Sequence, residues 1–220
     1  MKNDEKREAE NLFNKGIEYI KQAAECDWGH AQYELARMYE CGIGVEKDVN
    51  EGLKWYKRAA EQGDAHAQYE LACTYYYGRY GVEENHAEAF KWCKNAAEAG
   101  NPKAQERLGY YYFCGIGTPK DESLALEWCE KAAEQGNVDA MEMTGFFNYI
   151  LGNDSEAFVW YEKAATLGNG EAQRQLGDMY LKGKVVARDK KEAARWYKQA
   201  KENNWDLSKK QERVVKRWGK

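Results

Sequence analysis

One pattern recurs five times along this chain and constrains its fold more than any other feature. Each copy holds a Trp and, four residues later, an Ala pair or its remnant; the copies span residues 55–63, 92–100, 128–136, 160–168 and, in a worn form, 196–203. A segment aligned on Ala31, Ala67, Ala104, Ala140 and Ala172 precedes each Trp, so the successive periods are 36, 37, 36 and 32 residues. Self-similarity at this period predicts a stack of two-helix units rather than a closed globule.

Within each period, small and apolar residues at helical spacing predict two helices. In the first unit we expect the contact face of the first helix at Ala31, Leu35, Ala36 and Tyr39, and the buried stripe of the second helix at Leu53, Trp55, Tyr56, Ala59 and Ala60. Gly42 should end the first helix, because Gly tolerates the left-handed conformation that closes a helix. Asp48 and Asp121 are candidate caps for second helices.

The stack is expected to have capped ends. Tyr19 falls where Trp55 falls in the repeat, and Ala23-Ala24 fall where the Ala pair falls, so a leading helix from about residue 4 to 25 matches the second helix of a partial repeat. A closing helix is expected from about residue 208 to 218. The sequence thus predicts an N-terminal capping helix over residues 1–28, five repeats over residues 29–204 and a basic C-terminal capping helix over residues 205–220.

The repeated motif resembles that of a known family. Its first half reads Ala-x-x-x-Leu-(Ala/Gly)-x-x-Tyr-x-x-Gly-x-Gly, and its second half has an acidic residue, Ala or Leu, Trp, Lys-Ala-Ala and Gly. Over about residues 10 to 203 this is similar to the Sel1-like repeat family, a relative of the tetratricopeptide repeats. The resemblance implies an all-α, right-handed α-α superhelical solenoid of helix-turn-helix repeats, which acts as a noncatalytic adaptor or scaffold and binds protein partners on its concave side.

Three units depart from the motif. Unit two has an inserted residue within residues 78–81, and unit five has Lys182-Gly183-Lys184 in place of the double-Gly turn. Unit four has Thr144 for Leu and Asn148 for Tyr, and lacks four residues before its Trp. We expect these departures to change local curvature and to leave the stack in place.

Helical phase predicts which residues line the concave groove. If Leu35 and Tyr39 face the partner helix, Tyr33 and Arg37 lie on an adjoining face, and the same phase can be carried through the other units. Large aromatic side chains on such a face suit recognition, since they supply contact area at little cost in rotamer freedom. The candidate partner-binding residues are Tyr33, Arg37, Tyr69, Tyr76, Tyr77, Tyr110, Phe113, Phe146, Tyr149 and Arg174.

Each of these candidates has an alternative interpretation. An aromatic stripe at helical spacing is more often part of a core than of a site, and some of these rings are expected only to fill the inside of the stack. Arg37, Lys103, Arg174 and Lys182 flank the aromatic residues and are candidates for holding acidic groups of a bound peptide. Their alternative is an ordinary solvated face.

Charge is distributed unevenly along the chain. The net charge is −4, while residues 208–220 hold six basic residues against Glu212, so that residues 1–207 carry −9. A basic amphipathic helix can meet an anionic membrane or nucleic acid; we expect this one instead to close the stack, with its charges attracted to the acidic body. An acidic solenoid suits a nucleic-acid backbone poorly, because that backbone is negatively charged. No stretch of the sequence reaches the ~20 apolar residues of a membrane span. We therefore expect a protein or peptide partner, with no nucleic acid and no membrane insertion.

The six cysteines do not form a repeated pattern of pairs. The two repeats that hold two cysteines separate them differently, so we expect reduced and mostly packed thiols, as in a reducing compartment. The amino terminus enters a charged helix without an apolar signal core, which predicts a cytoplasmic protein. A mature form with its signal removed would look the same.

The sequence carries no familiar catalytic or metal-binding motif. The sequence has no HExxH, no Ser elbow, no Walker loop and no paired CxxC. His30 and His66 occupy equivalent repeat positions, which suggests a shared structural role at the start of the first helix. His66 and Cys73 lie about two turns apart, on the order of 10 Å, too far to share a metal alone. The sequence predicts no catalytic residues, no metal ligands and no cofactor.

Two other functions stay open beside the adaptor. An immunity or inhibitor protein that occludes a toxin or an enzyme needs the same kind of surface. A hydrolase would use a Cys or His of the groove, such as Cys73 with a lowered thiol pKa. We expect a monomer, with weak self-association through Trp205 and Trp218 as the alternative.

Overall fold

The computed structural model describes residues 2–219, which hold twelve α-helices and one 3-10 turn. The helices pack one after another as helix-turn-helix repeats, so the predicted all-α repeat fold is confirmed. Each helix from α2 to α11 is 13 residues long. By its internal contacts the chain divides into two compact units, residues 1–105 with 116–119 and residues 106–115 with 120–220.

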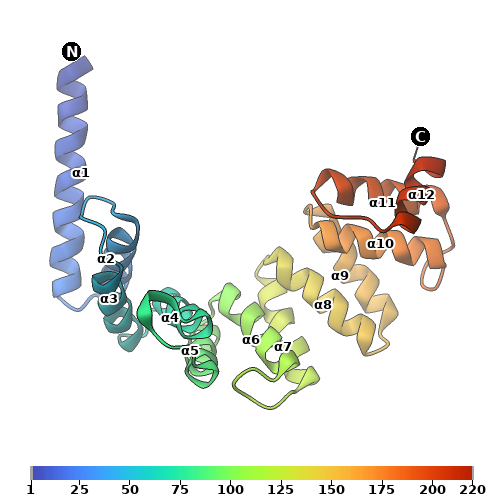
Figure 1. The fold of residues 1–220 in the computed structure, drawn as a ribbon, viewed down its shortest axis with the longest axis horizontal. Coiled ribbons are helices and arrows are strands. Elements are labelled where there is room, and N and C mark those ends of the chain that lie inside the picture. Colours follow the sequence, from blue (N-terminus) through green and yellow to red (C-terminus); the bar gives the residue numbers. More distant parts are fainter. Residues whose placement is uncertain (1, 220) are drawn as a thin grey trace. The chain divides into compact units, whose positions relative to one another are not determined.

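The first unit holds a long leading helix followed by two helix pairs. Figure 1 shows the pairs as helix hairpins, in which residues 42–48 join α2 to α3 and residues 78–85 join α4 to α5. Its elements are α1 (Lys2–Glu25), α2 (Gly29–Cys41), α3 (Val49–Glu61), α4 (Ala65–Tyr77), η1 (Arg79–Gly81), α5 (His86–Glu98) and the first residues of α6 (Pro102–Cys114).

The second unit continues the same pattern and ends on a short helix. Its elements are the rest of α6, then α7 (Glu122–Glu134), α8 (Val138–Ile150), α9 (Asp154–Thr166), α10 (Gly170–Lys182), α11 (Lys190–Glu202) and α12 (Lys209–Trp218). In the part of the chain that is described, no helix combines the length and apolar character that a membrane crossing requires.

The predicted helix boundaries are confirmed at residue level. The Asp48 carboxylate accepts hydrogen bonds from the backbone N–H groups of Asn50 and Glu51 at 3.0 Å each, which satisfies donors that the first turn of α3 leaves open. The Asp121 carboxylate caps α7 by accepting a hydrogen bond from the backbone N–H of Leu124 at 2.9 Å. Gly42 closes α2 with a φ of 72°, in the left-handed region that Gly reaches without strain.

A recurrent glutamine ties each second helix to the first helix that follows it. The Nε2 atoms of Gln32, Gln68, Gln105 and Gln173 donate to the backbone carbonyl eight residues earlier, at 2.9–3.1 Å. Those carbonyls lie in the last turn of a helix, where intrahelical donors run out. Repeat four has Met141 at this position and packs it in the core.

Four of the five tryptophans that mark the repeat are only half-buried, less than the sequence pattern predicts, whereas Trp196 is buried. Trp55 is half-buried at the edge of its core cluster, while Tyr56, Ala59 and Ala60 next to it are fully buried. A cation covers the exposed face of the indole: the Arg58 guanidinium lies 4.7 Å from the Trp55 ring centre. A large ring that gains cation–π contact at the surface does not need full burial.

The inserted residue of unit two forms the 3-10 turn η1. Tyr80 in this turn has a φ of 56°, and its hydroxyl donates to the Glu40 carboxylate, which also accepts a hydrogen bond from Tyr56 at 2.7 Å. The insertion therefore adds a part-buried polar contact between neighbouring repeats.

Candidate functional site

A pocket of about 180 Å³ lies along the first helices of the first unit. Three successive first helices contribute to it, because equivalent faces of neighbouring repeats lie side by side in a stack. It is lined by Tyr33 of α2, by His66, Tyr69 and Glu70 of α4, and by Asn101, Pro102 and Lys103 at the start of α6.

Helix starts position the polar side of this pocket. The Asn101 side chain caps α6, accepting from the backbone N–H groups of Lys103 and Ala104 at 3.0 Å each. Its amide nitrogen also donates to the Ala65 carbonyl at the start of α4, at 3.5 Å. The cap therefore joins the two helix starts on which His66 and Lys103 stand.

Burial shapes the electrostatics of the pocket. It raises the pKa of the Glu70 carboxyl above its ordinary range, and the nearby Glu40 carboxylate adds to the rise. Lys103 and two arginines lower that pKa and limit the shift. Burial also raises the pKa of the Tyr33 phenol, which is therefore a hydrogen-bonding neutral group at physiological pH. The pocket thus combines two half-buried tyrosine rings with one carboxyl and one exposed ammonium group.

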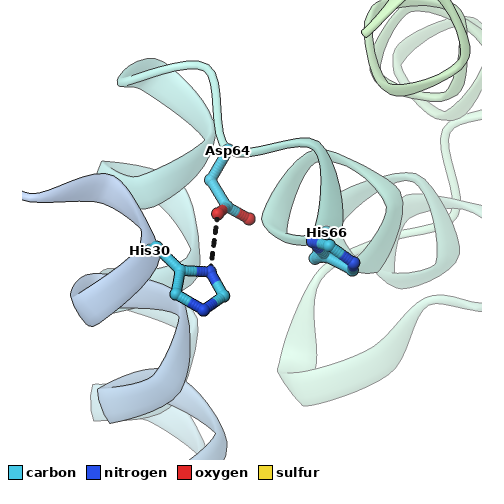
Figure 2. Close-up of side chains that lie close together, drawn as sticks. All are labelled: His30, Asp64 and His66. Carbon is cyan, nitrogen blue, oxygen red and sulfur yellow. Dashed lines mark hydrogen bonds and ion pairs between the residues drawn. The ribbon is translucent and has the colours of Figure 1, made fainter. Parts of the chain in front are cut away.

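Two histidines and an aspartate meet beside this pocket, at the stacked starts of α2 and α4. Figure 2 shows His30 on α2, Asp64 in the turn before α4 and His66 on the first turn of α4. The His30 Nδ1 atom lies 3.4 Å from the Asp64 Oδ2 atom, and one ligand atom from each of the three residues lies within 4.8 Å of the others. His30 and His66 are exposed, and the Tyr33 ring lies 6.0 and 5.4 Å from their rings.

The other candidates of the first unit lie outside the 180 Å³ pocket. Arg37 is exposed and lines a separate apolar pocket of about 370 Å³ between α1 and α2. Tyr76 stacks on His86 at 5.3 Å and meets the Tyr77 ring edge-on at 4.8 Å. Tyr77 is 46% exposed, with the Arg79 guanidinium 4.8 Å above its ring.

In the second unit several candidates already have partners within the chain. Phe113 and Phe146 lie 5.7 Å apart and pack against the buried core around Phe147. Arg174 forms ion pairs with Glu171 and Asp178. These contacts favour the core and balanced-charge interpretations for the three residues.

The remaining candidates of the second unit lie at its surface. Tyr110 is half-buried, with its ring 6.5 Å from that of Tyr111. Tyr149 is 39% exposed, and the Lys182 Nζ atom lies 5.7 Å from its ring centre. The exposed Tyr149 ring and the Lys182 ammonium group beside it are therefore accessible to a partner.

Two further features of the second unit bear on function. Burial, together with Glu171 and Asp139, raises the pKa of the Glu142 carboxyl to about 7. A larger groove of about 810 Å³ lies on the side of the second helices, lined by residues of α9 and α11 that include Val159, Lys163 and Trp196. None of the candidate partner-binding residues predicted from the sequence lines this groove.

Two of the three buried thiols, those of Cys93 and Cys129, do not have the environment of a nucleophile. Cys129 is fully buried, and burial raises its thiol pKa, with Glu106 adding to the rise. Cys93 is also buried, and its thiol donates to the Ala104 carbonyl at 3.3 Å. A reactive cysteine needs an accessible thiolate favoured by positive charge, and neither of these two has one.

Comparison with known proteins identifies the repeat. The profile of the Sel1 repeat matches residues 10–28, 29–64, 65–101, 102–137, 140–169 and 170–205. The chain belongs to the Sel1 repeat family. Sel1 repeats form scaffolds that typically mediate protein interaction and are generally non-catalytic. The six matched segments include a partial one over α1, where the sequence pattern indicated the second helix of an incomplete repeat.

Solved structures of Sel1 repeat proteins are similar to this chain. A Sel1 repeat protein from Oxalobacter formigenes is 35% identical over 87% of this chain and 80% of its own, with a TM-score of 0.79. The protective antigen c5321 of uropathogenic Escherichia coli is 36% identical with a TM-score of 0.80; the match covers 86% of this chain and 41% of that protein. The immunity protein PA5088 from Pseudomonas aeruginosa, 20% identical over 86% of this chain and 72% of its own with a TM-score of 0.51, shares the fold alone. No curated protein matches the chain.

Two acidic residues, Glu70 in the 180 Å³ pocket and Asp64 beside it, could not be predicted as site residues from the sequence. Glu70 and Asp64 carry no motif of their own, and Asp64 reads only as a helix cap. The usable signal was the equivalence of His30 and His66, because equivalent positions of adjacent repeats become neighbours once the repeats stack.

Proposed function

We propose that this chain is a noncatalytic adaptor that binds a segment of a protein partner in the 180 Å³ pocket on the first helices of its first unit. The observation that carries the proposal is the composition of the pocket: the tyrosines Tyr33 and Tyr69 line it together with the half-buried Glu70 carboxyl and the exposed Lys103 ammonium group. Tyrosine is enriched at interaction hot spots because it combines contact area with a hydrogen-bonding group.

Pre-organisation supports binding at this place. The Tyr33 and Tyr69 rings stand on helices that are tied to their neighbours by the glutamine side chains described above. A partner that docks there does not need to order the surface, which lowers the entropic cost of association. The remaining partner-binding candidates stay predictions, each within its own unit: Arg37, Tyr76 and Tyr77 in the first, and Tyr110, Phe113, Phe146, Tyr149 and Arg174 in the second.

Affinity capture from a lysate of the source organism tests the proposal. The test variant combines Tyr69→Ala with Lys103→Glu, and the matched control combines Val159→Ala with Lys163→Glu in the groove of the second helices. We expect wild type and control to retain the same partner and the test variant to lose it about tenfold or more, the effect of removing a hot-spot residue. Unchanged helical content by circular dichroism is required of both variants.

The opposite pattern would contradict the proposal. Loss of the partner from the Val159 and Lys163 variant alone would move the site to the α9–α11 groove, and equal capture by all three proteins would exclude both pockets. The identity of the partner separates the adaptor from the inhibitor alternative. An inhibitor would abolish the activity of a captured toxin or enzyme, whereas an adaptor leaves its partner active.

We propose the cytoplasm as the compartment of this chain. Cys26 and Cys41 are exposed thiols, and exposed thiols persist where the surroundings are reducing.

A further inference from the structure

We propose that His30, Asp64 and His66 form a zinc-binding site that joins the first two full repeats. The set offers two imidazole nitrogens and one carboxylate oxygen, which are ordinary ligands of Zn²⁺ and of related first-row divalent cations. The ligands come from two repeats that are 36 residues apart in the sequence, so the site exists only in the stacked structure.

One pair of these ligand atoms already has the spacing that a bound zinc requires. Ligands about 2.1 Å from a tetrahedral zinc lie about 3.4 Å from one another. The His30 Nδ1 and Asp64 Oδ2 atoms are 3.4 Å apart, and the three ligand atoms lie within 4.8 Å of one another. Small rotations of exposed imidazole side chains close the remaining gap, and such rotations cost little at a surface.

The backbone around the site explains how these residues meet. Asp64 is the N-cap of α4, and its Oδ1 atom accepts a hydrogen bond from the Ala67 N–H at 2.8 Å. The cap holds the carboxylate still and leaves the Oδ2 atom directed at His30, as Figure 2 shows. The start of α2 packs closely on this turn, since a Cβ atom at Gly29 would lie 3.1 Å from the Gln62 Cβ.

The repeat itself indicates that this site is specific to the first two units. At the position of His30 and His66 the later repeats carry Lys103, Asp139 and Glu171. At the position of Asp64 they carry asparagines, which cap their helices through the same side-chain oxygen. Asn therefore performs the capping role alone, and the carboxylate of Asp64 adds a charge that a cap does not require.

Titration of the full chain with Zn²⁺ alone tests the site. We expect one equivalent to bind by isothermal titration calorimetry, and the NMR signals of the His30 and His66 rings to shift while those of His86 stay in place. His66→Ala should weaken zinc binding by more than about tenfold, since loss of even a supporting partner of a ligand costs 10–100-fold. His86→Ala is the matched control and should bind zinc as the wild type does.

Asp64→Asn separates the metal site from helix capping. It should lower zinc affinity about tenfold or more while the metal-free melting temperature stays unchanged, because Asn caps the equivalent helices. The Cys26→Ser, Cys41→Ser double variant should keep the site, which excludes binding through exposed thiols. Absence of saturable binding, unchanged affinity in His66→Ala, or loss of binding in the cysteine variant would each overturn the proposal. No partner protein is used, so this result does not depend on the proposed function.

Discussion

At the scale of single residues, two tyrosines at the same repeat position, directly after the repeat Trp, differ in whether their hydroxyl forms a hydrogen bond. The Tyr197 hydroxyl donates to Asp178 at 2.6 Å, whereas among the described residues the buried Tyr161 hydroxyl has no hydrogen-bond partner. A buried polar group without a partner costs about 1–3 kcal/mol, and a made hydrogen bond contributes about 1 kcal/mol. We predict that Tyr161→Phe raises the free energy of unfolding by about 1 kcal/mol and that Tyr197→Phe lowers it by a similar amount. Urea unfolding of the two matched variants measures this, and equal destabilisation by both would contradict it.

At the scale of a helix, two glycines that both lie inside helices have different surroundings. Gly16 lies in α1, where an added Cβ would meet nothing within 4 Å, whereas a Cβ at Gly145 in α8 would lie 2.8 Å from the Tyr161 ring. Gly→Ala in an open helix position stabilises by about 1 kcal/mol, while overpacking a core costs about 1–3 kcal/mol. We predict that Gly16→Ala raises the melting temperature and Gly145→Ala lowers it. Thermal unfolding followed by circular dichroism tests this, and a lower melting temperature for Gly16→Ala would show that α1 needs the glycine.

At the scale of the whole molecule, the repeats should distribute stability locally. The buried Gln211 of α12 donates to Asp178 of α10 at 3.0 Å and completes a capping box with Ser208. In a stack each repeat is stabilised mainly by its neighbours, so a loss at one end stays near that end. We predict that Gln211→Ala accelerates amide hydrogen exchange in α10–α12 about tenfold, equivalent to about 1.4 kcal/mol, and leaves α2–α5 unchanged. Uniform acceleration along the chain would show instead that the molecule opens as one unit.

The sequence by itself determined the helices, their order and most of their boundaries. Those features depend on local chemistry: the capping carboxylates of Asp48 and Asp121, the left-handed Gly42 and the spacing of small residues all act within a few positions of the chain. The degree of burial was harder to predict. Trp55 is half-buried beneath an arginine, and Phe113 packs into a core, although both lie at helical spacing.

Only the tertiary structure decided which side chains meet. Tyr33 and Tyr69 share a pocket while Tyr76 stacks on His86, and helical phase alone does not distinguish these outcomes. His30 and Asp64 are 34 residues apart, and they meet because the start of α2 packs beside the turn before α4. Periodicity in a sequence reports the face on which a residue lies. The distance between neighbouring repeats, which brings two such faces into contact, depends on how side chains pack between them.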